Sequence, residues 1–162
     1  MNTYSIISCQ TVSDYESAAT VTRDYLASLD FDISFQHIDD ELATFQTMYG
    51  RPDGCYLLSY WMDHVIAGGV GFRRLSSKYC EMKRLFIYPP YRKQGIGRTL
   101  CQELLKQAQL RTYKFMRLDI MNRSMAANHL YEKLGFYDIS SYCENPYPTA
   151  RFMEIDLAVI HI

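Results

Sequence analysis

The chain of 162 residues lacks any long apolar run and any targeting pattern at its start. No apolar stretch approaches the ~18 residues that a membrane span requires, and the first residues show no basic segment followed by an apolar one. We therefore expect a cytoplasmic protein without a membrane partner. Repeats, low-complexity segments and linkers are also lacking. Residues 1–162 are thus expected to form one domain, large enough to bury ~70% of the surface that its unfolded chain exposes.

A pairing pattern among the cysteines is missing too. They are odd in number and scattered, without Cys-x-x-Cys or Cys/His metal spacing, which indicates reduced thiols and no bound metal. We expect most of them to be small buried hydrophobic side chains; they are Cys9, Cys55, Cys80, Cys101 and Cys143. An excess of charge is also absent, because the net charge is −1 and the pI is about 6.4. These values argue against a general affinity for nucleic acid or anionic membranes.

What the chain does have, between Glu81 and Leu105, is a strand, a glycine-rich basic turn and an amphipathic helix. The run Leu85–Tyr88 is β-branched and aromatic, as in strands, and Pro89-Pro90 ends it because proline cannot donate to a strand ladder. After Gly97 the apolar residues recur every four positions, with polar residues on the opposite face. This spacing predicts a helix that ends near Thr112.

The turn between this strand and helix carries glycines and cations beside the first unpaired amides of the helix. Such a turn suits a phosphate, because helix N-terminal amides and the macrodipole attract anions. The alternative is a solvated basic turn, which an isolated Gly-x-Gly favours; the flanking strand and helix favour phosphate. No Gly-Lys-Ser/Thr follows, and Leu100 stands where a dinucleotide fingerprint requires glycine. The turn comprises Arg92, Lys93, Gln94, Gly95, Ile96, Gly97 and Arg98.

Two motifs together resemble the GNAT superfamily of acetyl-CoA-dependent N-acetyltransferases. Arg92-x-x-Gly95-x-Gly97 matches its pyrophosphate-binding motif, and the segment Ala127 to Phe136 looks like its late helix and following turn. The detailed match covers residues 79 to 156. The resemblance implies acetyl-CoA as the donor and an amine of a small molecule or peptide as the acceptor. The first two helices would then form one wall of the acceptor site.

The resemblance also implies the cofactor contacts. The pyrophosphate would sit on the backbone amides of residues 92–97, with Arg98 nearby, and the pantetheine arm would pair with Leu85 and Ile87 like an added strand. An amide of this strand would also polarise the thioester carbonyl. Ser124 stands where many relatives have a cofactor-contacting asparagine, so either its hydroxyl or Asn128 is expected to supply that contact.

Three residues are candidates for catalysis. Tyr131 aligns with the tyrosine that in many relatives protonates the coenzyme A thiolate; the alternative is a core tyrosine on the apolar face of its helix. Glu81 and Asp119 are both candidates for the base that deprotonates the amine, with a slight preference for Glu81; the alternative for each is a strand-end carboxylate paired with a cation. Neither Cys80 nor Cys101 has a histidine at an informative spacing, so direct transfer in a ternary complex is preferred.

The remaining sequence predicts an α/β fold with a mixed, splayed and twisted sheet flanked by helices. The spacing Ser13-x-x-Glu16 predicts a capped helix to about Ser28, and Asp39-Asp40 is expected to cap a second one. Ser124 is the expected N-cap of the late helix. Expected strands are Tyr4–Gln10, Cys55–Trp61, Val65–Arg73, Tyr79–Tyr88, Lys114–Met121, Phe136–Ile139 and Ala150–Leu157. The first hairpin is antiparallel, and the strand after the glycine-turn helix is parallel to Tyr79–Tyr88.

Three functions fit these features. The leading one is N-acetyl transfer from acetyl-CoA to an amine. The second is a module that binds acyl-CoA without turnover, and the third is a nucleic-acid-binding domain using Arg92, Lys93 and Arg98, which the acidic overall balance disfavours. Tyr142, Asn145 and Tyr147, in one aromatic loop, are expected either to line the acceptor pocket or to pack on the sheet. The sequence leaves open whether the protein is a monomer or a homodimer.

Overall fold

The computed structural model describes residues 3–62, 64–121 and 125–161, so Ser124 lies outside the described residues. Within them, one sheet has the strand order β1-β2-β3-β4-β5-β7-β6. The strands are β1 (Tyr4–Ser8), β2 (Cys55–Trp61), β3 (Val65–Arg74), β4 (Tyr79–Ile87), β5 (Phe115–Met121), β6 (Tyr137–Ile139) and β7 (Ala150–Asp156). The helices are α1 (Val12–Ala27), α2 (Ile38–Ala43), α3 (Phe45–Tyr49), α4 (Ile96–Leu110) and α5 (Met125–Leu134), with short 3-10 turns at Ser34–Gln36 and Pro89–Tyr91.

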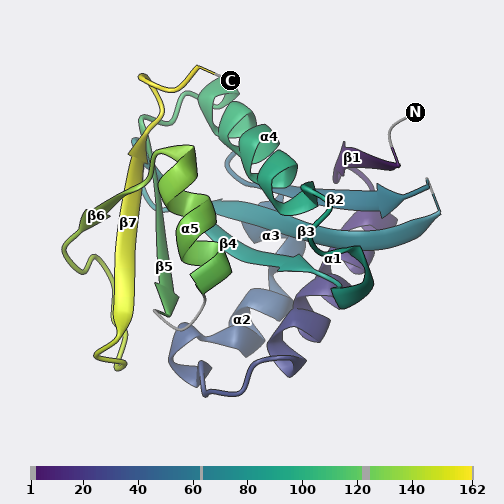
Figure 1. Cartoon of the computed structure of the whole chain (residues 1–162), viewed down its shortest axis with the longest axis horizontal. Helices are drawn as coiled ribbons and strands as arrows, with labels where there is room; N and C mark the ends of the chain where they lie inside the picture. The colour runs from purple at the N-terminus through teal and green to yellow at the C-terminus, as the bar shows by residue number, and fades with distance from the viewer. Residues whose placement is uncertain (1–2, 63, 122–124, 162) are drawn as a thin grey trace.

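Helices cover both faces of the sheet. Figure 1 shows α4 and α5 in front of it and α1, α2 and α3 behind. Each face has its own core: the α4 and α5 side buries Leu100, Leu104 and Met116, while the α1 and α3 side buries Tyr49 and Tyr56. This arrangement confirms the predicted mixed α/β fold. No helix of the described residues is both long and apolar enough to span a bilayer.

The sheet splits between β4 and β5. These strands are parallel, as the β4–α4–β5 crossover predicts, but they pair only from Tyr79 to Glu81 on β4 and from Phe115 to Arg117 on β5. Beyond these residues no pairing between the two strands continues, whereas β4 stays paired with β3 as far as Ile87. The second half of β4 therefore has one backbone edge that no strand occupies, and this edge faces a gap in the sheet (Figure 1).

A bulge shapes β4 next to this gap. The register between β3 and β4 shifts between Gly69 and Gly71, and Arg84 adopts a left-handed backbone with φ of 64°. Gly68 lies beside the bulge, where an added Cβ would stand 2.3 Å from the Phe86 carbonyl oxygen, so only glycine fits. Glycines in the middle of β3 thus mark both a bulge and a close backbone approach.

The predicted helix starts are wrong in two places. Thr11, and not Ser13, caps α1, because its hydroxyl accepts the Asp14 amide while the Asp14 carboxylate accepts the Thr11 amide. The cap of α2 is His37, whose φ is 56°, so Asp39 and Asp40 lie in the first turn instead. There the carboxylates favour the helix through its macrodipole and not through capping.

The cysteines behave as predicted. All five are free, and every one except Cys143 is buried. Burial raises the pKa of the Cys101 thiol to about 12, and with the help of the nearby Asp14 and Cys55 it raises that of Cys9 to about 12 as well. Both thiols are therefore kept protonated at neutral pH, which makes them poor nucleophiles.

Candidate functional site

Two adjoining cavities open where β4 and β5 part. One, of about 240 Å3, is lined by Tyr131 and is called here the tyrosine cavity. The other, of about 370 Å3, is lined by Glu81 and is called the glutamate cavity. Among the described residues, four line both cavities and are called here the shared wall: Phe35, Gln36, Lys83 and Asp119. The site predicted from sequence therefore divides into two compartments joined at Lys83 and Asp119.

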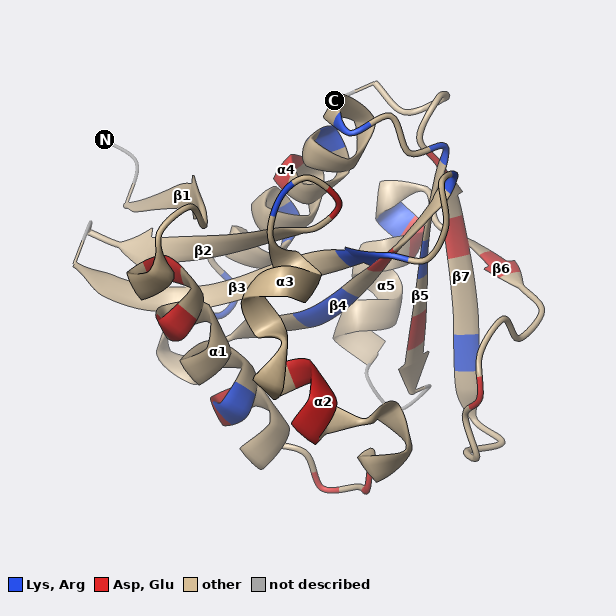
Figure 2. Cartoon of the chain, turned by 180° about the vertical axis from the view of Figure 1, so that it is seen from behind, with Lys and Arg blue, Asp and Glu red and all other residues tan. Residues whose placement is uncertain are grey.

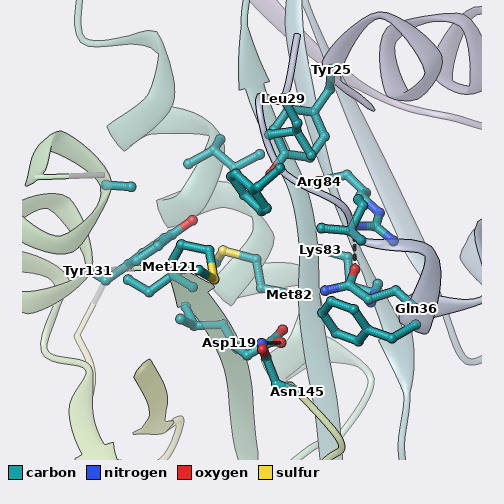
Figure 3. A pocket seen from close by; sticks show the side chains of 17 residues that line it. Tyr25, Leu29, Gln36, Met82, Lys83, Arg84, Asp119, Met121, Tyr131 and Asn145 are labelled. Carbon is teal, nitrogen blue, oxygen red and sulfur yellow. Dashed lines mark hydrogen bonds between the residues drawn. The ribbon is translucent and has the colours of Figure 1, made fainter. Parts of the chain in front are cut away.

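Tyr131 reaches into the tyrosine cavity from α5. Its side chain is 5% exposed, and its ring packs edge-on against Phe136. Figure 3 shows the ring extending from α5 toward the cavity, with Lys83, Arg84 and Gln36 on the opposite side. Burial raises the pKa of Tyr131 well above its ordinary value, and the neighbouring Cys101 and Tyr25 act in the same direction. The phenol thus keeps its proton at neutral pH and is suited to donate it.

Glu81 is buried beside the glutamate cavity, and both of its carboxylate oxygens accept hydrogen bonds. One carboxylate oxygen accepts from Arg73 Nε at 2.8 Å and lies 3.5 Å from Lys83 Nζ. The other accepts the Tyr142 hydroxyl at 2.6 Å. Burial raises the pKa of Glu81, but Lys83, Arg73 and Tyr142 outweigh burial and hold it below its ordinary value. This environment stabilises the charged carboxylate and opposes its protonation.

Asp119 lies at the junction of the two cavities. It is half-buried on β5, and its carboxylate accepts Asn145 Nδ2 at 3.2 Å. One ligand atom from each of Asp119, Glu81 and Cys143 lies within 4.8 Å of the others. The structure therefore places the two candidate bases close together, but only Asp119 lines the cavity that contains Tyr131.

The loop between β6 and β7 lies against both cavities. Tyr142 is bound to Glu81, Asn145 lines the tyrosine cavity, and the Tyr147 hydroxyl donates to the Asp32 carbonyl at 2.6 Å. The Tyr147 ring also packs against Phe31, at 5.8 Å between ring centroids. These contacts join the loop to the segment between α1 and α2. Of the three loop residues, Asn145 lines a cavity, whereas the Tyr142 ring packs edge-on against Phe152 of β7.

The glycine turn before α4 has the geometry of an anion site. Gly95 precedes the helix with φ of 81°, and no side chain of the described residues caps the first amides of α4. Lys93, Gln94 and Arg98 around these amides are exposed. The uncapped amides, the positive end of the helix and the cations fit a diphosphate.

The free edge of β4 continues from this turn toward Tyr131. The Tyr88 amide bonds to Ala67 on β3, so by strand alternation the backbone groups of Leu85 and Ile87 point into the gap. Arg92 Nε donates to the Ile87 carbonyl at 2.8 Å, and Leu85 lines the tyrosine cavity. The anion site and the tyrosine cavity thus lie along one exposed strand edge, as a long extended ligand requires. Asn128, the other candidate contact, is buried on α5 and accepts Arg151 Nη1 at 3.0 Å.

Two features of β4 near the cavities, Lys83 and Arg84, are not among the residues predicted from the sequence. Lys83 is 9% exposed and lines both cavities, and burial lowers its pKa, an effect that Glu81 partly offsets. Its position two residues after Glu81, on the same strand face, was a usable signal. Arg84 forms a buried ion pair with Glu41 of α2, 2.6 Å between Nη2 and Oε2, and donates to Gln36 at 2.7 Å. Figure 2 shows the acidic α2 lying across from the basic segment of β4.

Comparison with known sequences decides the family. The profile of the Acetyltransferase (GNAT) family matches residues 21–136, which is more than two thirds of the chain. The chain belongs to the GNAT family. The enzyme class and the donor predicted from the two motifs, an N-acetyltransferase that uses acetyl-CoA, are thereby confirmed.

Individual relatives of this GNAT protein resemble it along nearly its whole length. An uncharacterized N-acetyltransferase of Schizosaccharomyces pombe is 29% identical over 155 residues, 95% of each chain. Among solved structures, a GNAT acetyltransferase from Elizabethkingia anophelis with acetyl-CoA bound has a TM-score of 0.68 at 18% identity, over 96% of this chain and 99% of that one. The ribosomal-protein-S18-alanine N-acetyltransferase from Escherichia coli has a TM-score of 0.71 at 21% identity, over 95% and 94%. At these identities the solved structures support the fold alone.

The backbone of the glycine turn gives a testable prediction. We expect Gly95→Ala to lower the free energy of unfolding by about 1 kcal/mol, because a left-handed backbone strains any residue with a Cβ. Gly97→Ala is the matched control. Its Cβ would meet Ile87 and Leu130 at 3.8 and 3.9 Å, which are ordinary contacts, and alanine favours a helix over glycine. Thermal unfolding of the two variants measures the difference. Equal stabilities would show that the turn tolerates a side chain at position 95.

Proposed function

We propose that this GNAT enzyme transfers an acetyl group from acetyl-CoA to the primary amine of a small molecule or peptide, by direct transfer in a ternary complex. The observation that carries the proposal is the free edge of β4, which runs from the uncapped α4 terminus to buried Tyr131. A donor with a diphosphate at one end and a reactive group at the other matches this edge in charge and direction. A cytoplasmic location, consistent with the free cysteines, is part of the same proposal.

The β4 edge and the glycine turn hold the donor, which supplies the acetyl group as a thioester. The amides at the start of α4 bind the diphosphate, with Lys93 and Arg98 adding charge. Leu85 and Ile87 pair their backbone groups with the amides of the pantetheine arm. Because the bulge at Arg84 redirects the backbone at this point, an amide beside it is placed to donate to the thioester carbonyl.

A carboxylate accepts one proton during the reaction, and Tyr131 donates another. The neutral amine, formed when the ammonium gives its first proton to water, attacks the acetyl carbon. The base takes a proton from the nitrogen as the carbon–nitrogen bond forms, and the carbon–sulfur bond breaks. Tyr131 gives a proton to the departing sulfur. One proton is accepted and one is donated, so the charges balance and exchange with water restores both groups.

We assign the base to Asp119 rather than to Glu81. Asp119 lines the same cavity as Tyr131, whereas Glu81 lines only the neighbouring one. The Glu81 carboxylate is also bound by Arg73 and Tyr142, and its lowered pKa makes it a weak proton acceptor. Because aspartate is short, Asp119 accepts the proton directly or through one water. Glu81 instead holds Lys83 and the β6–β7 loop in position.

This assignment predicts that Asp119→Asn lowers kcat/KM by roughly 100-fold, the usual size of a general-base contribution. Glu144→Gln, at an exposed carboxylate of the glutamate cavity, serves as the control and should stay within about twofold. Steady-state rates from pH 5 to 9 measure both. If Asp119→Asn keeps parental activity while Glu81→Gln loses it, the base is Glu81.

The overall proposal is tested by release of free thiol from acetyl-CoA across a panel of amines, with mass spectrometry of the products. Turnover with at least one amine and formation of its N-acetyl derivative is the expected result. Tight coenzyme A binding without turnover on any amine would support an acyl-CoA-binding module instead. Direct transfer further requires that protein incubated with acetyl-CoA alone gain no acetyl-cysteine.

A further inference from the structure

The shared wall of the two cavities presents one positive and one negative side chain. Lys83 and Asp119 both line the tyrosine cavity and the glutamate cavity. Lys83 Nζ lies 3.5 Å from a Glu81 oxygen, and the nearest oxygens of Glu81 and Asp119 lie within 4.8 Å of each other. Both charged side chains therefore lie near Glu81 and line the tyrosine cavity.

The other buried charges near this wall are already matched. Glu41 is paired with Arg84 at 2.6 Å, and Glu81 is paired with Arg73 at 2.8 Å. Lys83 makes the longest of the contacts to Glu81, which Arg73 and Tyr142 approach more closely. After these pairings, Lys83 and Asp119 are the charges of the shared wall that a ligand can complement. Asp40 and Glu144, also in the glutamate cavity, are exposed, so water and salt screen them.

An apolar surface adjoins the two charges. The segment between α1 and α2 contributes Leu29, Phe31, Ile33 and Phe35 to the tyrosine cavity, and β5 contributes Ile120. Tyr147 packs against Phe31 and Phe35 at 5.8 and 6.1 Å between ring centroids, which holds these rings over the cavity. In Figure 3, Lys83 lies across the cavity from Tyr131, with Asp119 and Asn145 at one side between them.

We propose that the acceptor is a free α-amino acid with an apolar side chain. Its amine lies beside Asp119, its carboxylate binds Lys83, and its side chain packs on the apolar surface between α1 and α2. This inference rests on the proposed acetyl transfer and names the substrate class for it. A diamine would place a second cation against Lys83, and a peptide N-terminus would present a neutral amide there, so neither gives the lysine an anionic partner besides Glu81.

Matched ligand pairs test the carboxylate directly. L-phenylalanine and 2-phenylethylamine, and L-leucine and 3-methylbutylamine, differ only by the carboxylate; L-phenylalaninamide adds a peptide-like amide. We expect each amino acid to bind roughly 10-fold to 100-fold more tightly than its amine or amide, since a charge-assisted bond is worth that much. Calorimetric titration with coenzyme A present measures binding without turnover, and kcat/KM with acetyl-CoA gives the same comparison in the reaction.

Replacing Lys83 by an uncharged residue tests whether this lysine causes the preference for amino acids over amines. We expect Lys83→Met to reduce the acid-to-amine ratio at least tenfold, whereas Lys78→Met, at an exposed lysine that lines neither cavity, keeps the ratio of the parent. Glu81 retains Arg73 in the variant, which limits the cost to folding. Equal binding of acids and amines by the parent protein would overturn the inference, as would a preference that survives Lys83→Met. Turnover of amines without preference for acids would refute only the substrate class, whereas absence of any turnover would refute the proposed function.

Discussion

Replacement of Tyr131 by phenylalanine is expected to lower kcat by roughly 100-fold while the dissociation constant of coenzyme A changes by less than about twofold. The variant removes only the hydroxyl, and loss of a general acid typically costs 10²- to 10⁴-fold in rate. The ring, which packs against Phe136 in the buried face of α5, stays in place. Binding is expected to persist because the anion site at α4 and the edge of β4 are unchanged. Thiol release under saturating substrate gives kcat, and calorimetry gives the affinity for coenzyme A.

Tyr113→Phe is the control for this variant. Tyr113 is also buried, and its hydroxyl donates to the Asp53 carbonyl away from both cavities. It should lose some stability but keep kcat. Because burial raises the pKa of Tyr131 well above its ordinary value, the acid form persists up to about pH 10. The parent enzyme should accordingly show no loss of rate from this group between pH 7 and 9. An equal kcat for Tyr131→Phe and the parent would leave the thiolate to be protonated by solvent.

The parts of the site that the sequence predicted are those defined by local patterns. The anion turn is a strand, two glycines and a helix in immediate succession, and the structure gives Gly95 the left-handed backbone that such a turn uses. Tyr131 lies on an i, i+4 apolar face, so its burial also follows from its helix alone. The fold could be predicted for the same reason, because a parallel crossover and a hairpin follow from the order of elements.

What the sequence could not settle depends on residues far apart in the chain. The sequence leaves both Glu81 and Asp119 as candidate bases, because no local pattern shows that Arg73 and Tyr142 donate hydrogen bonds to the Glu81 carboxylate. The bulge at Arg84 depends on the register between β3 and β4, which an apolar pattern does not encode. The N-cap of α1 was misplaced by two residues because the pattern Ser13-x-x-Glu16 matches a capping box as well as the Thr11 and Asp14 pair does.

The ion pair at this bulge connects β4 with α2. Arg84 belongs to β4, while Glu41 and Gln36 line the glutamate cavity. The Glu41 carboxylate accepts from Arg84 and also from the Tyr49 hydroxyl at 2.6 Å, and all three side chains are buried. A buried charge that loses its partner is strongly destabilising, because no water replaces the lost interaction.

The substitution Glu41→Gln leaves the Arg84 cation buried without this counterion. We therefore expect it to lower the free energy of unfolding by about 3–5 kcal/mol. For a domain of this size such a loss lowers the Tm by roughly 6–20 °C. Urea or thermal unfolding measures it. Arg74→Gln is the matched control, because it breaks an ion pair with Asp53 in which both side chains are 49% exposed, and such pairs contribute about 1 kcal/mol or less.

The pH dependence of this difference separates the ion pair from a simple packing defect. Burial raises the pKa of Glu41, but Arg84 and Tyr49 outweigh burial and hold it below its ordinary value of 4.5. Because the pKa of Glu41 is lower in the folded protein than in the unfolded chain, the ion pair contributes fully to the free energy of unfolding when the pH is above the unfolded-state pKa. This contribution is lost as the pH falls through the folded-state pKa. The gap in stability between the parent and Glu41→Gln should thus be constant from pH 6 to 8 and shrink below about pH 4.5. A gap of the same size at pH 3 would show that the glutamine disrupts packing at α2, and that the charge of Glu41 contributes nothing.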